Sequence, residues 1–222
     1  MFKHEPIELG YDLVAETTPN GRMYKTPDGK SYPSITTMLG YFSKAAIMAW
    51  RKRVGAEEAN RISRRAASQG TRIHQIAEDY INNKPDYLKE DEMPHIHFMW
   101  KPLKKVLDEH LGTIVLQECP LYSHYLKLAG RVDLVAEFDG KLSIVDFKTS
   151  RRIKTRDEIS SYFMQAAAYS IMFEERTGTP ITQLVIAMTV ENESEPLLFV
   201  EKRDDWAPFL LDKRDKFYKS LK

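Results

Sequence analysis

The spacing of apolar positions changes near residue 112, and this change divides the chain into two kinds of predicted structure. Before that point, apolar side chains in residues 73–81 recur three and four positions apart, which is typical of an amphipathic helix. After it, residues 113–122, 128–138 and 141–148 alternate and are rich in Val, Ile and Leu, which predicts strands. We therefore expect helices first and a sheet second.

Turns, caps and breaks predict the remaining elements. A Pro-Asp-Gly turn predicts a β-hairpin over residues 23–32. Gly70 is expected to interrupt the helical region, and Gly112 to end the last helix before the sheet. A T-x-x-E capping box at Thr155 is expected to open a long helix that stops at Gly178. The other predicted elements are helices over residues 34–41, 45–68, 92–111 and from 206 onward, and strands over 181–190 and 197–202.

The order of these elements predicts the fold class. Three strands, a helix and two more strands indicate an α/β fold of the mixed α+β kind. Its central mixed sheet would have about five strands flanked by helices. A length of 222 residues suits a single domain. Within it we expect an N-terminal hairpin and helical part (1–111), an αβ catalytic core (112–202) and a C-terminal helix (203–222).

Composition and cysteine usage limit the class of protein. Hydrophobic residues make up 42% of the chain and charged residues 29%, which is a globular composition. The N-terminal residues lack the apolar stretch of a signal peptide, and no segment is apolar for long enough to span a bilayer. A single cysteine, Cys119, excludes an internal disulfide and an iron–sulfur cluster. We expect an intracellular, cytoplasmic protein without a membrane partner.

Basic residues are concentrated in two places. Residues 44–72 hold eight basic and two acidic side chains, a net charge of +6 on a chain whose total is +1, and residues 151–156 hold four basic and no acidic ones. Such clusters suggest a surface for a polyanion such as DNA. The alternative is a solvated helix face. The arginines expected to contact DNA are Arg51, Arg53, Arg61, Arg64, Arg65, Arg72, Arg151 and Arg152.

Carboxylates and a lysine converge in the most informative stretch, residues 130–150. If the Asp-Gly pair at 139–140 is a two-residue hairpin loop, Asp133 lies opposite Asp146, and Lys148 shares their face. Opposed like charges are destabilising unless something compensates them, and a divalent cation such as Mg²⁺ or Mn²⁺ does so. The alternative is a surface ion-pair ladder without a metal.

This stretch resembles the core of the PD-(D/E)XK nucleases. The resemblance lies in GRVD at residues 130–133, followed after twelve residues by DFKTS. G-x-x-x-H at residues 70–74, with Glu78 beyond it, is similar to a helix of the RecB-like branch. Q-x-x-x-Y at residues 165–169 is similar to a second signature of that branch.

Two N-terminal motifs narrow the resemblance. YPSIT at residues 32–36 and WRKR at residues 50–53 look like the mitochondrial genome maintenance exonuclease group and its phage-encoded relatives. The resemblance covers about residues 32–190, and the cysteine count limits it to members without an iron–sulfur cluster.

The resemblance implies a role for each residue of the core. Asp133, Asp146 and the backbone carbonyl of Phe147 would bind one or two Mg²⁺ or Mn²⁺ ions, with His74 as a further ligand. Lys148 would sit beside the attacking water and stabilise the charged transition state. Without the resemblance, a lone histidine at the edge of an apolar stripe is more often a packed residue.

Three further residues carry roles with open alternatives. Glu118 corresponds to the first acidic position of the family by strand order, and otherwise it is an ordinary edge-strand charge. Gln165 would hydrogen-bond the catalytic cluster or DNA. Tyr169 shares its helix face and would support the site or contact a base, or simply pack on the sheet.

The expected function is a metal-dependent DNA exonuclease with 5′-phosphate products, as the resemblance implies. It would act on DNA with a free end, single-stranded DNA above all, in replication, recombination or repair. The basic region, residues 44–72, would form an arch under which the strand is threaded. A monomer is the favoured oligomeric state, and a phage-encoded protein that acts in the host cell is one source that fits the resemblance. The alternatives are a structure-selective endonuclease and a non-catalytic DNA-binding recombination factor on the same core.

Overall fold

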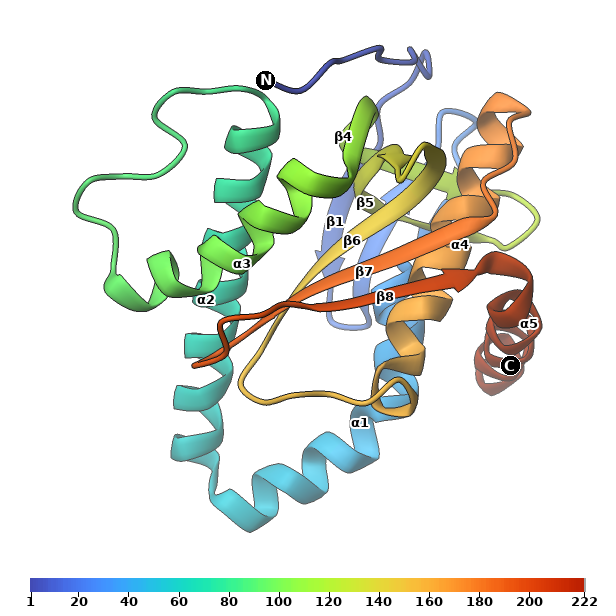
Figure 1. The fold of residues 1–222 in the computed structure, drawn as a ribbon. Helices are drawn as coiled ribbons and strands as arrows, with labels where there is room; N and C mark the ends of the chain where they lie inside the picture. Colours follow the sequence, from blue (N-terminus) through green and yellow to red (C-terminus); the bar gives the residue numbers. More distant parts are fainter. Residues whose placement is uncertain (222) are drawn as a thin grey trace.

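The structure is a computed structural model that describes residues 1–221 (Figure 1). The helices are α1 (Ile35–Val54), α2 (Ala56–Ile81), α3 (Pro94–His110), α4 (Ser160–Thr177) and α5 (Arg203–Ser220), with a 3₁₀ turn η1 (Asp157–Ile159) before α4. The strands are β1 (Val14–Thr18), β2 (Gly21–Lys25), β3 (Ser31–Pro33), β4 (Leu111–Ser123), β5 (Leu128–Phe138), β6 (Lys141–Ser150), β7 (Gln183–Val190) and β8 (Leu197–Lys202).

A five-stranded mixed sheet in the order β4-β5-β6-β7-β8 forms the centre. All neighbours are antiparallel except β6 and β7, which are parallel. Parallel neighbours need a crossover connection, and α4 supplies it. The predicted fold class, a mixed sheet of five strands flanked by helices, is therefore confirmed.

Alternate side chains of the sheet fill two separate cores. Ile144 faces one core, together with buried residues of α1, α4 and α5. Val145, the next residue, faces the other core with residues of α2 and α3. Because β6 is buried on both faces, any polar residue on it needs a partner in the protein or a ligand.

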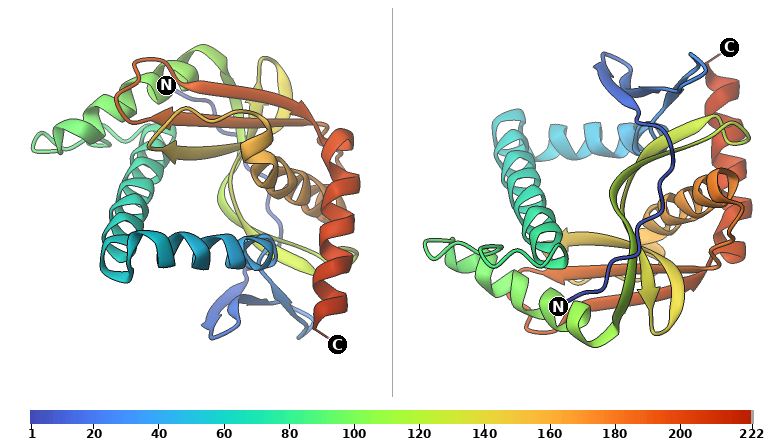
Figure 2. Two further views of the ribbon diagram at one scale, coloured as in Figure 1. Left: turned by 90° about the horizontal axis from the view of Figure 1, so that it is seen from below. Right: turned by 90° about the horizontal axis from the view of Figure 1, so that it is seen from above.

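The first part of the chain is a small antiparallel sheet and a long bent pair of helices. The predicted hairpin is present, with Tyr24 opposite Tyr32, and β1 adds a third strand that the sequence pattern did not predict. Helices α1 and α2 run away from the sheet and meet at Gly55, far from the core (Figures 1 and 2). Gly55 has φ +87°, a conformation that favours glycine, so the bend is built at this residue.

Three predicted helix boundaries are wrong. Helix α1 runs from Ile35 to Val54 through the expected break between residues 41 and 45, and the break lies at Gly55 instead. Gly70 does not interrupt the helical region, because α2 continues through it to Ile81. A single glycine costs a helix about 1 kcal/mol, which the neighbouring alanines and the packing of the last turns outweigh. Gly112 is not a helix cap but lies inside β4, since α3 passes directly into that strand at Leu111.

The predicted capping box at Thr155 forms one of its hydrogen bonds but does not directly precede the long helix. The Thr155 N–H donates to Glu158 Oε2 at 2.9 Å, but the η1 turn precedes α4, which begins at Ser160. The helix stops at Gly178, as predicted. Helix α5 begins at Arg203, and residue 222, the last of the predicted C-terminal helix, lies outside the described residues. None of the described helices is long and apolar enough to cross a membrane.

Candidate active site

Three acidic residues lie level with one another on adjacent strands. The β4–β5 ladder keeps one register on both sides of Glu118, which places Glu118 opposite Asp133. The β5–β6 ladder follows the predicted hairpin register as far as Leu134 and Val145, one step short of Asp133 and Asp146. Carboxylates from β4, β5 and β6 therefore meet at one point of the sheet.

The ladder between β5 and β6 opens where these acids meet. In place of the next backbone bond, the Phe147 N–H donates to Oδ2 of the Asp133 side chain at 2.9 Å. Helix α2 covers the opening and brings His74 over it, with Nδ1 at 3.5 Å from the same carboxylate oxygen. The side chain of Asp133 is thus held by the backbone of β6 and faced by an imidazole.

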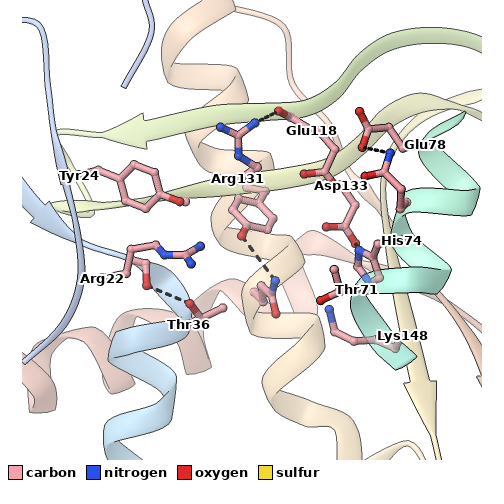
Figure 3. A pocket seen from close by; sticks show the side chains of 16 residues that line it. Arg22, Tyr24, Thr36, Thr71, His74, Glu78, Glu118, Arg131, Asp133 and Lys148 are labelled. Carbon is pink, nitrogen blue, oxygen red and sulfur yellow. Dashed lines mark hydrogen bonds and ion pairs between the residues drawn. The ribbon is translucent and has the colours of Figure 1, made fainter. Parts of the chain in front are cut away.

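His74, Glu118 and Asp133 form a group that fits a metal ion. One ligand atom from each lies within 4.8 Å of the other two. Two carboxylates are the oxygen ligands that Mg²⁺ and Mn²⁺ prefer, and the imidazole supplies a third ligand. All three side chains line the same hollow in Figure 3.

Burial works against the charge of Glu118. Burial and, to a smaller extent, the nearby Asp133 raise the pKa of this carboxyl to about 7, although His74 acts in the opposite direction. The backbone of Glu118 has φ +45°, which is uncommon outside glycine. Arg131 donates a hydrogen bond to the Glu118 carbonyl oxygen and holds the backbone in this form.

Asp146, Lys148 and Gln165 form a second group beneath the first. The side chain of Asp146 is 1% exposed, and its Oδ2 is ion-paired with the Lys148 ammonium. Its Oδ1 accepts a hydrogen bond from Gln165 Nε2 of α4 at 3.2 Å. Burial raises the pKa of Asp146 to about 6, while Lys148 acts in the opposite direction. Burial disfavours the Lys148 ammonium, but Asp146 and Asp133 outweigh this, so its pKa is raised and it stays charged.

Of the four metal ligands that the family resemblance implied, the structure places two in the candidate metal group and two outside it. His74 and Asp133 lie in the candidate metal group together with Glu118, whose position on β4 had been inferred only from strand order. Asp146 is engaged by Lys148 and Gln165, and the Phe147 backbone contact is made by its N–H.

Tyr169 is a buried residue that lines the site rather than an exposed one. It is 2% exposed, and Gln165 Nε2 lies 3.5 Å from its hydroxyl. Its ring fills the space beside Gly130, where a Cβ atom would come within 2.8 Å of the Tyr169 Cε1 atom. Gly130 is thus a required glycine of the GRVD motif, because the tyrosine occupies the volume of its missing side chain.

A cavity of about 470 Å³ contains the metal group and extends well beyond it. On its far side lie Arg22 and Tyr24 of β2 and Thr36 of α1. Figure 3 shows Arg22 and Arg131 across the hollow from His74. Sequence reasoning missed these residues of β2, because nothing in the local pattern indicates that an N-terminal hairpin packs beside a site built on the central sheet.

The structure brings the two basic clusters together. Arg61 and Arg65 of α2 and Arg151 of the loop after β6 line one small depression. Several of the predicted DNA-contacting arginines are partly neutralised by acids. The ion pairs are Arg61–Glu58, Arg65–Glu191, Arg72–Glu92 and Arg152–Glu158. Arg53, Arg64 and Arg151 form no ion pair among residues 1–221.

The sheet and its row of acids define the class of protein: a nuclease-like α/β domain with a candidate metal centre. The family model of the PD-(D/E)XK nuclease superfamily matches residues 48–216. The chain belongs to this superfamily, and membership supports a nuclease function.

Two individual proteins are similar to parts of the chain. Mitochondrial genome maintenance exonuclease 1 of Mus musculus is 30% identical over 86 residues, which is 39% of this chain and 25% of that protein. The chain therefore matches only a quarter of the length of this relative. A crystal structure of a proposed exonuclease from Eubacterium rectale superposes with a TM-score of 0.44 at 11% identity, over 68% of this chain and 66% of the other.

Proposed function

We propose that this protein is a metal-dependent DNA exonuclease that acts on single-stranded ends and leaves 5′-phosphate products. The observation that carries the proposal is the convergence of His74, Glu118 and Asp133 within 4.8 Å, directly above the buried Asp146–Lys148 pair. Such a set suits phosphodiester hydrolysis, since a divalent ion bound there would polarise the phosphate and lower the pKa of an attacking water.

Each side chain has a proposed task. Glu118, Asp133 and His74 hold the ion, and Asp146 and the Phe147 carbonyl complete the set that the family resemblance implies. Lys148, which remains charged, stabilises the negative charge that develops on the phosphate during attack. Gln165 orients Asp146 through its hydrogen bond, and Tyr169 supports Gln165 from behind.

The bent helix pair supports action on ends. Between residues 43 and 58, α1 and α2 bury no side chain, and this part of the protein projects away from the core, which supports its proposed role as an arch. Its basic residues would track the phosphates of a strand passing beneath it. A strand that must be threaded needs a free end, and we therefore expect closed circles to resist cleavage.

Digestion of end-labelled linear and closed circular DNA with Mg²⁺ or Mn²⁺ tests the proposal. Linear single strands should be shortened from an end, and circular single strands should remain intact. Asp133→Asn and Lys148→Met should each lower kcat by about a hundredfold or more, because the first removes a proposed metal ligand and the second removes the positive charge beside the reacting phosphate.

A matched variant controls for the loss of a carboxylate. Asp139→Asn makes the same chemical change in the turn between β5 and β6, and asparagine tolerates the φ of +51° found there. It should cleave like the parent protein. Cleavage of circles at the rate of linear strands would indicate an endonuclease, and full activity of Asp133→Asn would exclude this site.

A further inference from the structure

Two arginines that line the cavity form no ion pair with an acidic side chain of residues 1–221. Eight other arginines form ion pairs with acidic side chains: Arg61, Arg65, Arg72, Arg152, Arg156, Arg176, Arg203 and Arg214. Arg22 and Arg131 form none among residues 1–221, although both line the cavity that contains Glu78, Glu118 and Asp133. Figure 3 shows both guanidinium groups on the side of the cavity opposite His74.

The backbone of Arg22 is fixed at the edge of this cavity. The Ser34 N–H donates to the Arg22 carbonyl oxygen at 2.8 Å, and the Arg22 N–H donates to Thr37 Oγ1 at 3.0 Å. The approach is close because residue 21 is glycine, where a Cβ atom would lie 2.4 Å from Thr37 Cγ2. These bonds tie β2 to the start of α1, so the Arg22 side chain extends from an anchored position.

The start of α1 adds to the positive character of this wall. Ser34 caps the helix by accepting a bond from the Thr37 N–H, and the first turn contains no acidic residue. The N-terminus of a helix carries a partial positive charge. The cavity therefore has carboxylates on one side, suited to a cation, and Arg22 with a helix N-terminus on the other, suited to an anion, while Arg131 lies beside Glu118 and also lines the cavity.

We propose that Arg22, together with the free N–H groups of Arg131, binds the phosphate next to the one that is cleaved. A guanidinium can bind a phosphate through two parallel hydrogen bonds. DNA with its scissile phosphate at the metal group would place a second phosphate in the remaining cavity, whose total volume of about 470 Å³ is in the range of ligand sites. This subsite would set the register of the strand and therefore the length of the product. The proposal rests on the proposed nuclease function.

The test uses single-stranded oligonucleotides with one neutral methylphosphonate linkage at different distances from the scissile bond. The parent protein should lose about tenfold in kcat/KM when the neutral linkage directly adjoins the scissile one. Arg22→Ala should have a kcat/KM about tenfold lower than the parent on unmodified DNA. For this variant, the neutral linkage next to the scissile bond should lower kcat/KM little further. Both changes remove the same contact, so their effects should not add.

Two further variants control for the fold and for general charge. Lys25→Ala removes an exposed charge from the same strand, outside this cavity, and should behave like the parent protein. Arg22→Lys should recover part of the loss, because it keeps the charge without the two-pronged geometry. If Arg22→Ala melts at a lower temperature than the parent, Arg22→Lys is used in its place in the methylphosphonate test.

The outcomes separate this proposal from the function on which it rests. The phosphate subsite would be refuted if the losses from Arg22→Ala and from the neutral linkage were fully additive, or if Arg22→Ala cleaved unmodified DNA like the parent protein. Either result would leave the nuclease assignment intact. Failure of the parent protein to cleave unmodified DNA with either metal ion would refute the nuclease assignment, and the subsite with it.

Discussion

Glu118 combines two unfavourable features in one residue. Its backbone adopts a positive φ, and its half-buried carboxyl has a pKa of about 7. Features of this kind cost free energy and persist only where the surroundings hold them in place. The hydrogen bond that Arg131 donates to the Glu118 carbonyl oxygen holds the backbone in this conformation. The ionised form of this carboxyl is disfavoured in the folded protein. A bound metal ion would stabilise that form, which is compatible with Glu118 as a metal ligand.

The pKa of Glu118 predicts how stability depends on pH in the absence of metal. Between about pH 4.5 and pH 7, the folded protein holds a proton on Glu118 that the unfolded chain has lost. The contribution of this group to the free energy of unfolding should therefore fall as pH rises through that window, and stay low above it. Glu118→Gln should be more stable than the parent at pH 8, and the difference should vanish near pH 4.

Urea unfolding in EDTA at a series of pH values measures this difference. Because the buried Asp146 also titrates in this range, the comparison is made between variant and parent and not on the parent alone. An equal gain in stability at pH 4 and pH 8 would contradict the assigned pKa.

Gly130 offers a stability test within the GRVD motif. Gly130→Ala should lower the free energy of unfolding by about 1–3 kcal/mol, because the new methyl group overlaps the Tyr169 ring and comes within 3.2 Å of Ile35. Gly40→Ala is the matched control, since Gly40 lies in α1 with open space around it. That change should be neutral or should stabilise the helix by up to about 1 kcal/mol. Similar losses for the two variants in thermal or urea unfolding would refute the steric explanation.

At the scale of elements, α1 and α2 differ from the helices that flank the sheet. Near the bend at Gly55 these helices bury almost no side chains. Packing holds mainly the start of α1, through Ile35 and Met38, and the part of α2 from Gln69 onward. Basic side chains on an unpacked helix pair add little to stability. A concentration of basic side chains on such a helix pair is typical of a surface that binds an anion.

The salt dependence of DNA affinity tests the arch. Arg53 and Arg64 have no acidic partner among the described residues, so their charges are available to phosphates. The double variant Arg53→Ala, Arg64→Ala should reduce the slope of log affinity against log salt by about 1.4, at roughly 0.7 per contact with a single strand. Fluorescence anisotropy with a labelled oligonucleotide, in Ca²⁺ or EDTA to prevent cleavage, measures the slope.

The control for this test removes two charges from elsewhere. Lys216→Ala with Lys219→Ala lowers the net charge equally from the exposed face of α5, away from the bend between α1 and α2 (Figure 1). Its slope should match that of the parent. A slope that falls equally in both double variants would mean that net charge, and not the arch, governs binding.

At the scale of the whole molecule, the site depends on elements that are far apart in sequence. Helix α2 supplies His74, β4 and β5 supply Glu118 and Asp133, and the crossover through α4 brings Gln165 onto Asp146. The metal group thus links α2 to the sheet. Binding an ion there should stabilise the fold as a unit, because the unfolded chain lacks this arrangement.

Metal-dependent stabilisation follows from this linkage. Mg²⁺ or Mn²⁺ at one hundred times its Kd should raise the free energy of unfolding by about 2.7 kcal/mol, and Tm by about 5–10 °C. Lys148→Met should keep this response, because Lys148 is not a proposed ligand. Glu118→Gln and Asp133→Asn should lose most of it. Differential scanning fluorimetry in EDTA and in metal measures the effect, and an undiminished response in Asp133→Asn would place the ion elsewhere.

Much of the core was determined by the sequence alone. The Asp-Gly turn and alternating apolar residues specify the β5–β6 register, since a two-residue loop and the period of a strand leave no freedom in which residues face each other. The sequence also predicted that Asp146 and Lys148 share a face, because residues two apart on a strand point to the same side. These are local consequences of strand geometry, whereas the role of Gln165 came from the family resemblance and its contact with Asp146 depends on the crossover through α4.

Only the tertiary structure decided the composition of the site. Glu118 joins His74 and Asp133 because β4 pairs with β5 in one register, a choice that depends on packing between segments and not on local spacing. The same is true of Arg22, which reaches the cavity because the N-terminal hairpin docks on the start of α1 through Gly21 and Thr37. Local patterns determine which side chains share a face, whereas contacts between distant segments determine which faces meet.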